Sequence, residues 1–306
     1  MRVLVTGGAG FIGHNAAVYL KSQGYEVVAF DNLKRATEFA IERLKVHDVP
    51  ILKGDILSSR ALEKALSGVD VVVHAAAYIS VKESLRKPAL YFRNNVAGTA
   101  NVAYACLRRG VKLLYISSAA VYGNPAHLPI SESQPANPTS PYGLTKLMGE
   151  EVVKFYARQG LKYAILRLFN VYGPGQSSTY AGVITRFIER VGVNKPPIIY
   201  GDGYQTRDFI HVYDVAEAIK LSIEGGLENE TLNIASGKPV TIKDLAELII
   251  KHVNQNLKPI FAKPRPGEIK HSHADISKAK RLLGFNPKIN LEQGLIELLK
   301  TPKSAV

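Results

Sequence analysis

The sequence predicts an α/β fold, with a doubly wound parallel sheet of the Rossmann type and a smaller C-terminal mixed α/β lobe. Through the first two thirds of the chain, short runs rich in β-branched residues alternate with longer segments of helical spacing. This alternation is typical of parallel strands that are covered on both faces by crossover helices. A glycine-rich turn at residues 7–13 follows the first run directly, as expected where the first strand of such a sheet enters its first helix.

The elements are predicted in order from these patterns. Nearly continuous apolar runs predict buried strands at residues 3–6, 26–30, 51–54, 69–74, 113–117 and 163–168. Helical spacing between them predicts helices at 11–23, 60–66, 88–108 and 141–158. Beyond Leu168 we expect helices near 181–191, 215–223, 242–253 and 291–299, with strands at 208–212 and 232–235 that return to the main sheet. The predicted units are therefore residues 1–169, with returning segments near 208–236, and residues 170–306.

Composition excludes several classes of protein. With 306 residues, 46% apolar and 21% charged, the chain is long enough for about two globular units. The net charge of +13 is spread along the chain without a run of like charges, which argues against nucleic acid as a partner. A single cysteine, Cys106, and the absence of an apolar membrane segment or a signal segment predict a cytoplasmic protein. His271 and His273 lack a third ligand, so no metal site is expected.

The turn at residues 7–13 is the predicted cofactor site. Gly7, Gly10 and Gly13 let the backbone approach a pyrophosphate held at the N-terminus of the following helix. Asp31 ends the second predicted strand, where a carboxylate accepts both hydroxyls of an adenosine ribose and repels a 2′-phosphate. NAD is therefore favoured over NADP, although the adjacent Lys34 and Arg35 keep NADP open.

Three residues form the candidate catalytic group. Tyr142 and Lys146 are four residues apart, about 400° of helical rotation, and so share one face of the predicted helix. An ammonium near a phenol stabilises the phenolate and lowers its pKa toward the range of a useful base. Ser118 follows the fifth predicted strand and could bind the same substrate oxygen.

These residues, together with further motifs, resemble the extended short-chain dehydrogenase/reductase family, and within it the UDP-glucose (UDP-galactose) 4-epimerases. The motifs stand at residues 5–13, 31–32, 54–56, 74–77, 94–96, 117–123, 142–146, 167–170 and 207–212. The resemblance implies that NAD is bound by Gly7, Gly10, Phe11, Ile12, Gly13, Asp31, Asn32, Asp55, Ile56, Ala75, Ala76, Ala77, Asn95, Ser117, Tyr142 and Lys146. It implies that a UDP-hexose is bound by Ser118, Tyr142, Asn170, Tyr200, Arg207, Arg265, Glu268 and Ser272.

The resemblance also suggests the reaction. Related dehydratases carry a Thr-Asp-Glu pattern where this chain has Ser118-Ala119-Ala120, and alanine supplies no acid, so epimerisation is favoured. Tyr142 would take the proton of the sugar 4-hydroxyl while C4 hydride passes to NAD, and the 4-keto sugar would rotate and take the hydride back. Ser272 is small where an aromatic residue in related enzymes limits space at C2, so we expect 2-acetamido sugars to be accepted as well.

Other functions remain open at this stage. A UDP-glucuronate 4-epimerase or a 4-ketoreductase that uses NADPH would share most of these motifs, and a non-catalytic nucleotide sensor could share the fold. The retention of Tyr142 and Lys146 argues against the sensor. The predicted helices at 88–108 and 141–158 resemble the pair through which family members dimerise, so a homodimer is expected.

Overall fold

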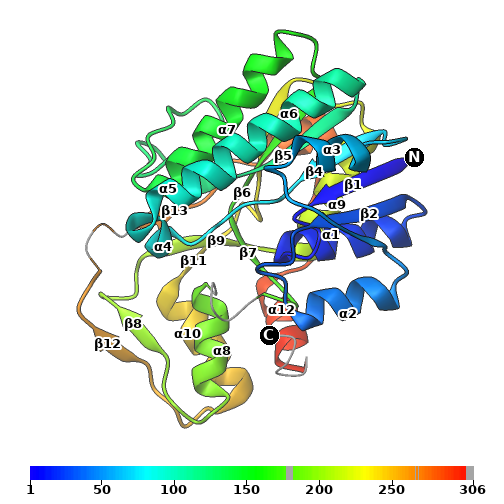
Figure 1. The fold of residues 1–306 in the computed structure, drawn as a ribbon. Coiled ribbons are helices and arrows are strands. Elements are labelled where there is room, and N and C mark those ends of the chain that lie inside the picture. Colours follow the sequence, from blue (N-terminus) through cyan, green and yellow to red (C-terminus); the bar gives the residue numbers. More distant parts are fainter. Residues whose placement is uncertain (177–181, 266, 268, 301–306) are drawn as a thin grey trace.

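The computed structural model describes residues 1–176, 182–265, 267 and 269–300. A seven-stranded parallel sheet runs through its centre in the order β10-β6-β5-β4-β1-β2-β3 (Figure 1). Its strands are β1 (Arg2–Thr6), β2 (Glu26–Asp31), β3 (Ile51–Lys53), β4 (Val71–His74), β5 (Lys112–Ser118), β6 (Tyr163–Leu168) and β10 (Glu230–Ile234). From β1 the chain first forms β2 and β3 on one side of β1, and then forms β4 on the other side of β1. The predicted doubly wound sheet is therefore confirmed.

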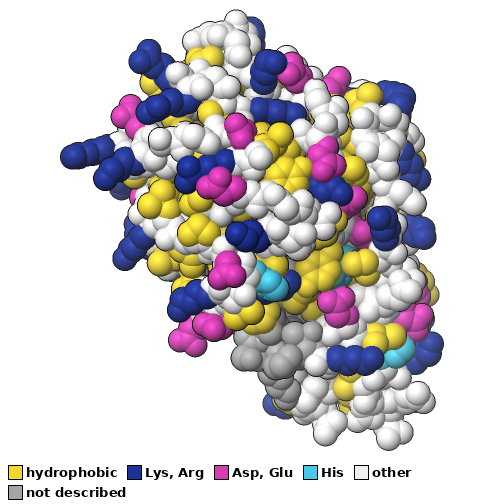
Figure 2. All heavy atoms as spheres, turned by 90° about the vertical axis from the view of Figure 1, so that its right-hand side faces the viewer, with side chains coloured by type: hydrophobic (Ala, Val, Ile, Leu, Met, Phe, Trp, Pro, Cys, Tyr) yellow, Lys and Arg dark blue, Asp and Glu magenta, His cyan; other side chains and the backbone are white. Residues whose placement is uncertain are grey.

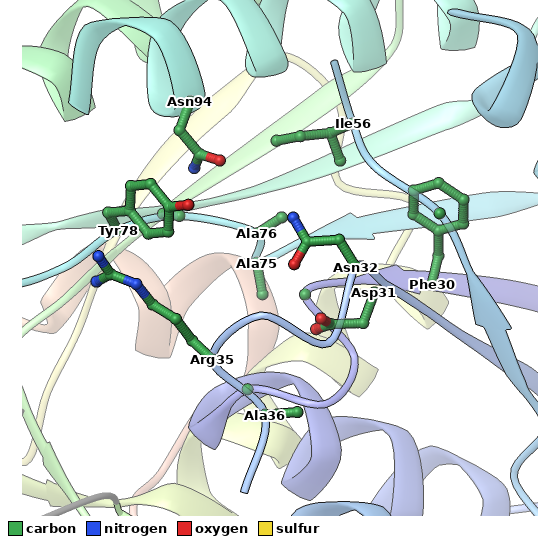
Figure 3. A pocket seen from close by; sticks show the side chains of 14 residues that line it. Phe30, Asp31, Asn32, Arg35, Ala36, Ile56, Ala75, Ala76, Tyr78 and Asn94 are labelled. Carbon is green, nitrogen blue, oxygen red and sulfur yellow. The ribbon is translucent and has the colours of Figure 1, made fainter. Parts of the chain in front are cut away.

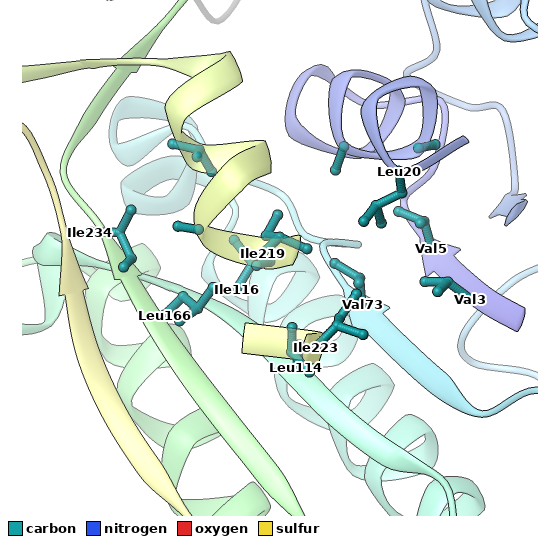
Figure 4. Packing of buried hydrophobic residues seen from close by; sticks show 14 of the residues in the cluster. Val3, Val5, Leu20, Val73, Leu114, Ile116, Leu166, Ile219, Ile223 and Ile234 are labelled. Carbon is teal, nitrogen blue, oxygen red and sulfur yellow. The ribbon is translucent and has the colours of Figure 1, made fainter. Parts of the chain in front are cut away.

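Helices cover both faces of this sheet because its strands are apolar on both sides. On one face, α1 (Phe11–Ser22) and α9 (Val212–Glu224) pack on a core that includes Val3 and Val5 (Figure 4). On the other face, α3 (Ser59–Ala65), α6 (Gly98–Arg109) and α7 (Pro141–Ala157) pack on a second core that includes Leu4. Successive side chains of a strand point to opposite faces, which assigns neighbouring residues to different cores.

The connections between strands contain elements that the sequence did not predict. They are α2 (Glu38–Val46), α4 (Val81–Arg86) and a short 3₁₀ helix at Ala119–Val121. The helix predicted at residues 88–108 consists of α5 (Pro88–Tyr91), a π-helical turn at Phe92–Ala97 and α6. A π-helical turn shifts the following side chains around the axis, and such turns are frequent beside functional sites.

The C-terminal lobe has its own sheets. Strands β7 (Asn170–Tyr172), β9 (Thr206–His211), β11 (Pro239–Thr241) and β13 (His271–Ser272) form one, and β8 (Ile198–Tyr200) pairs with β12 (Ile260–Ala262). The helices of this part are α8 (Val183–Val191), α10 (Ile242–Val253) and α12 (Leu291–Lys300), whereas α11 (Ser277–Leu283) packs with β10 and α9 on the core of the main sheet. Of the two segments expected to return to the main sheet, β10 does so, whereas β9 belongs to the lobe sheet.

Asp208 explains the position of β9. Its carboxylate is fully buried and accepts hydrogen bonds from the backbone N–H groups of Ser236 (2.8 Å), Gly237 (3.0 Å) and Ala274 (3.2 Å). A buried carboxylate needs such partners, because an unpaired one would be costly. These bonds attach β9 to the segments that follow β10 and β13, and the prediction for residues 208–212 could not include them.

The surface agrees with the scattered charge of the sequence. On the face shown in Figure 2, Lys and Arg side chains lie singly or in small groups among Asp, Glu and apolar side chains. A search for bilayer-crossing segments over the described residues finds no helix of the required length and apolarity.

Candidate active site

The glycine-rich turn brings backbone, without side chains, to the carboxyl edge of the sheet. Gly7 has φ +67°, and a Cβ on it would lie 2.7 Å from the backbone of Ala76. A Cβ on Gly13 would overlap the carbonyl oxygen of Gly7. Gly10 caps α1 without a side-chain hydrogen bond, and the first turn of α1 holds no acidic residue. The N–H groups at this helix end are therefore left for an anionic ligand.

Two adjoining cavities lie beside this turn, at the point where the strand order reverses. Such a switch point is where doubly wound folds bind nucleotides. The first cavity (Figure 3) is lined by Gly7, Gly10, Phe30, Asp31, Asn32, Arg35, Ala36, Gly54, Ile56, Ala75, Ala76, Ala77, Tyr78 and Asn94. The second is lined by Gly7, Ala9, Gly10, Phe11, Ile12, Gly13, Arg35, Thr37, Ala75, Ala77, Ile79, Gly175 and Gln176.

Asp31 stands at the end of β2 and faces the first cavity. Its carboxylate accepts hydrogen bonds from the N–H groups of Ala9 (3.1 Å) and Leu33 (2.7 Å), which fix its orientation. Asn32 beside it donates to Asp55 (3.0 Å). Burial alone would raise the pKa of Asp55, but hydrogen bonds from Leu57 N–H, Asn32 and Lys34 hold it below its usual value. Asp55 thus stays an acceptor that orients Asn32.

The predicted catalytic residues converge where β5 meets α7. Ser140 caps α7 by accepting a hydrogen bond from Gly143 N–H (3.1 Å), which places Tyr142 in the first turn. Ser118 is the last residue of β5, and its hydroxyl accepts a hydrogen bond from Ala120 N–H (3.2 Å) and lies beside the Tyr142 phenol. One turn further along α7, the ammonium of Lys146 donates to the carbonyl of Ile116 in β5 (2.8 Å).

Burial dominates the acid–base properties of this group. It raises the pKa of Tyr142, and the hydrogen bond with Ser118 acts in the opposite direction. Burial also lowers the pKa of Lys146 from 10.5 to about 7, while the Glu150 carboxylate acts against that shift. The net effect of these groups is to raise the pKa of Tyr142. The lowering of this pKa by the Lys146 ammonium, which the sequence predicts, is not seen in the structure and stays a prediction.

A buried ion pair holds α7 on the sheet. The Glu150 carboxylate accepts two hydrogen bonds from the Arg167 guanidinium of β6, at 2.9 and 2.6 Å, and a third from Ser117 Oγ (2.5 Å). Arg167 also donates to Tyr122 (2.9 Å), whose hydroxyl donates to Asn233 of β10 (2.7 Å). All five side chains are buried. The chain of bonds joins α7, β5, β6 and β10, so Ser117 serves this network.

Asn95 also links two parts of the fold through hydrogen bonds. Its amide donates to the Tyr78 carbonyl (2.9 Å) and to Thr145 Oγ1 (3.1 Å), and its oxygen accepts from Tyr78 N–H (2.8 Å). The side chain thereby fastens the segment after β4 to α7. Its neighbour Asn94 lines the first cavity. Cofactor binding by Asn95 and Ser117 remains a prediction from the family resemblance.

A third cavity lies in the C-terminal lobe and gathers four of the eight predicted substrate residues. Asn170, Tyr200, Arg207 and Arg265 line it, together with Arg186 and Arg190 of α8, which the sequence analysis did not single out. Two arginines four residues apart on one helix were the available signal. The Arg265 guanidinium lies over the Tyr200 ring, 3.7 Å from its centroid.

Ser272 does not line this cavity. It lies in β13, the edge strand of the lobe sheet, where it pairs with Arg207 of β9. Glu268 lies outside the described residues.

Comparisons with known proteins agree with this geometry. The sequence pattern of the NAD-dependent epimerase/dehydratase family matches residues 3–235. The chain belongs to this family. A UDP-glucose 4-epimerase of Azospirillum brasilense is 34% identical over 316 residues, which span 96% of this chain and 90% of that protein.

Two solved structures are similar to this protein over nearly its whole length. The UDP-glucose 4-epimerase of Thermotoga maritima with UDP-glucose has a TM-score of 0.92 and 35% identity, covering 98% of both chains. The UDP-N-acetylglucosamine 4-epimerase of Methanobrevibacter ruminantium with UDP-N-acetylmuramic acid has a TM-score of 0.92 and 37% identity, covering 98% of this chain and 97% of that one.

The residues beside the glycine-rich turn of this protein fit NAD, the dinucleotide of the family. The turn leaves no room for a Cβ at Gly7 or Gly13, and a carboxylate stands at the end of β2. Eleven of the predicted NAD residues line the two cavities: Gly7, Gly10, Phe11, Ile12, Gly13, Asp31, Asn32, Ile56, Ala75, Ala76 and Ala77. Tyr78 and Asn94 also line the first cavity but were not among the predicted NAD residues, and Arg35 was considered only as a cation near the ribose, because their positions depend on distant contacts.

The low pKa of Lys146 makes stability depend on pH. Because that pKa is about 7 when folded and 10.5 ordinarily, the folded chain binds fewer protons than the unfolded chain between these values. The contribution of Lys146 to the free energy of unfolding therefore becomes more favourable as pH rises. In cofactor-free protein, the free energy of unfolding of the parent minus that of Lys146→Met should rise from pH 7 to 9.5, by at most about 1.4 kcal/mol per pH unit.

Urea unfolding at several pH values measures this difference. Lys162→Met is the control, since Lys162 has an exposed side chain paired to Glu228. An equal pH slope in the Lys162 and Lys146 comparisons would contradict the assignment of the slope to the buried Lys146 ammonium.

Proposed function

We propose that this protein interconverts UDP-galactose and UDP-glucose by oxidation and re-reduction at C4 of the sugar. The observation that carries the proposal is the meeting of Ser118, Tyr142 and Lys146 at the junction of β5 and α7, on the sheet edge that holds the glycine-rich turn. The proposal is supported by relatives named UDP-glucose 4-epimerase that match nearly the whole chain.

The residues of the chain would divide the chemistry as follows. Tyr142 takes the proton of the sugar 4-hydroxyl, and Ser118 donates a hydrogen bond to the same oxygen. Lys146 places a positive charge behind the phenol when it is protonated. NAD, when bound, accepts the C4 hydride and returns it to the opposite face of the sugar. Ala119 and Ala120 offer no acid for elimination, which leaves reversal of the same proton transfer as the second half of the reaction.

The two units of the chain would divide the binding. Residues 1–169, with β10, hold the dinucleotide, and residues 170–306 hold the nucleotide sugar. The arginines 186, 207 and 265 meet the diphosphate, for which a guanidinium is well suited. Anchoring by the diphosphate leaves the hexose few contacts, and a sugar that must present both faces needs that freedom.

Removal of the phenolic hydroxyl tests the proposed base. Tyr142→Phe should lower kcat for UDP-galactose by about 100- to 10,000-fold while NAD stays bound. The substitution removes the hydroxyl that accepts the proton and leaves the rest of the cofactor site unchanged. Tyr156→Phe, on the same helix, is the control and should keep parental activity. Product analysis and cofactor content are measured together. An active Tyr142→Phe, or stoichiometric consumption of reduced cofactor by the parent, would contradict the proposal.

We further propose that 2-acetamido sugars are substrates, because Ser272 leaves space near C2. Support comes from the relative named UDP-N-acetylglucosamine 4-epimerase. The parent should turn over UDP-N-acetylgalactosamine, and Ser272→Tyr should lower kcat/KM for it at least about tenfold relative to UDP-galactose, as expected for a pocket that selects by size. Ser277→Tyr, an exposed position nearby, serves as the control. A parent without activity on the N-acetylated sugar would exclude this specificity.

We propose a homodimer formed through α6 and α7. Four large apolar side chains of these helices are exposed: Tyr104 (50%), Leu144 (39%), Met148 (38%) and Phe155 (50%). Exposed apolar side chains gathered on neighbouring helices are typical of an interface. Phe155→Glu should convert a dimer to a monomer in sedimentation experiments, and Val46→Glu on α2, with Val46 68% exposed, should not. A monomeric parent would refute the dimer.

A further inference from the structure

The two cavities beside the glycine-rich turn meet along a shared wall. Five residues line both of them: Gly7, Gly10, Arg35, Ala75 and Ala77. One cavity extends to Asp31 and Asn32, and the other extends to Phe11 and Gln176. A dinucleotide that occupies both cavities passes its diphosphate across this shared wall.

The charges around the cavities are few. Of the described residues that line either cavity, only Asp31 is acidic and only Arg35 is basic. A diphosphate carries two negative charges in this linkage, whereas the end of helix α1 supplies about half a positive charge. Arg35 is therefore the one cationic side chain that faces this part of the site among the described residues.

The guanidinium of Arg35 is held in place from the opposite wall. It stacks on the ring of Tyr78, 3.8 Å from its centroid (Figure 3). Its Nη2 atom lies 2.9 Å from the carboxylate of Glu83, which also accepts a hydrogen bond from the buried Tyr91 hydroxyl (3.0 Å). Tyr78 is in turn fixed through its backbone by Asn95. Arg35 thus joins the loop after β2 to the segment after β4.

We propose that Arg35 binds the diphosphate of the dinucleotide, and that Tyr78 and Glu83 are positioning residues that hold its guanidinium at the junction of the two cavities. The inference rests on the proposed NAD-dependent function and adds a residue to it. A planar guanidinium that is stacked and paired on one edge loses little further side-chain freedom when it meets a phosphate. Lysine in its place would keep the charge and lose the fork and the stack.

The test compares three ligands on cofactor-free protein by calorimetric titration: NAD⁺, ADP and adenosine. Arg35→Met should weaken the binding of NAD⁺ and ADP by about 10- to 100-fold, the effect expected for loss of a charge-assisted hydrogen bond. Adenosine, which lacks phosphate, should bind both proteins within about twofold. Arg35→Lys should lie between the parent and Arg35→Met.

Lys45→Met is the control. Lys45 on α2 is an exposed cation, pairs with Glu42 at 4.0 Å and lines neither cavity, so the variant should bind ADP as the parent does. Unchanged ADP binding in Arg35→Met would overturn the inference, and so would an equal loss for adenosine, which would indicate a collapsed wall. A parent that binds neither NAD⁺ nor ADP would overturn the proposed function itself.

Discussion

The position of the proposed catalytic side chains depends on the buried ion pair between Glu150 and Arg167. Helix α7 carries Tyr142 and Lys146, and this pair attaches that helix to β6, which lies between β10 and β5 in the sheet. Removal of one partner would leave an uncompensated buried charge, which costs about 3–5 kcal/mol. The same carboxylate opposes the desolvation of Lys146. One interaction therefore fixes the geometry of α7 and moderates the charge state of its buried lysine.

The two proposed ligand sites differ in the residues that line them. The two cavities beside the glycine-rich turn are lined mainly by glycine, alanine and other uncharged residues, so close backbone approach and helix N–H groups would provide most of the recognition of a cofactor. The lobe cavity has four arginines against one acidic residue, Glu189. A ligand that remains through successive turnovers benefits from a fitted cavity. A ligand that must enter, turn and leave is better held by charge at one anchored end.

Local sequence patterns predicted the parts of this structure that depend on neighbouring residues. The apolar strands, the glycine turn and the spacing of Tyr142 and Lys146 belong to this group, because period and steric demand decide them within a few residues. The sheet membership of β9 depends on Asp208 and three distant N–H groups. The assignments of Asn95, Ser117 and Arg35 depend likewise on partners from other elements. Side-chain pairing across the fold leaves no periodic signal in the chain.

Lys34 and Arg35, the two basic residues that follow Asp31 in the sequence, bear on the choice between NAD and NADP. Sequence alone left NADP open, since a cation beside the ribose can accept a 2′-phosphate. In the structure, Lys34 is directed to Asp55 at 3.4 Å and Arg35 to Glu83 at 2.9 Å, so each lies against a carboxylate. Asp31 remains at the end of β2 with its carboxylate oriented by two N–H groups. A 2′-phosphate placed there would meet the fixed negative charge of the Asp31 carboxylate. NAD carries no such group, and this arrangement selects it.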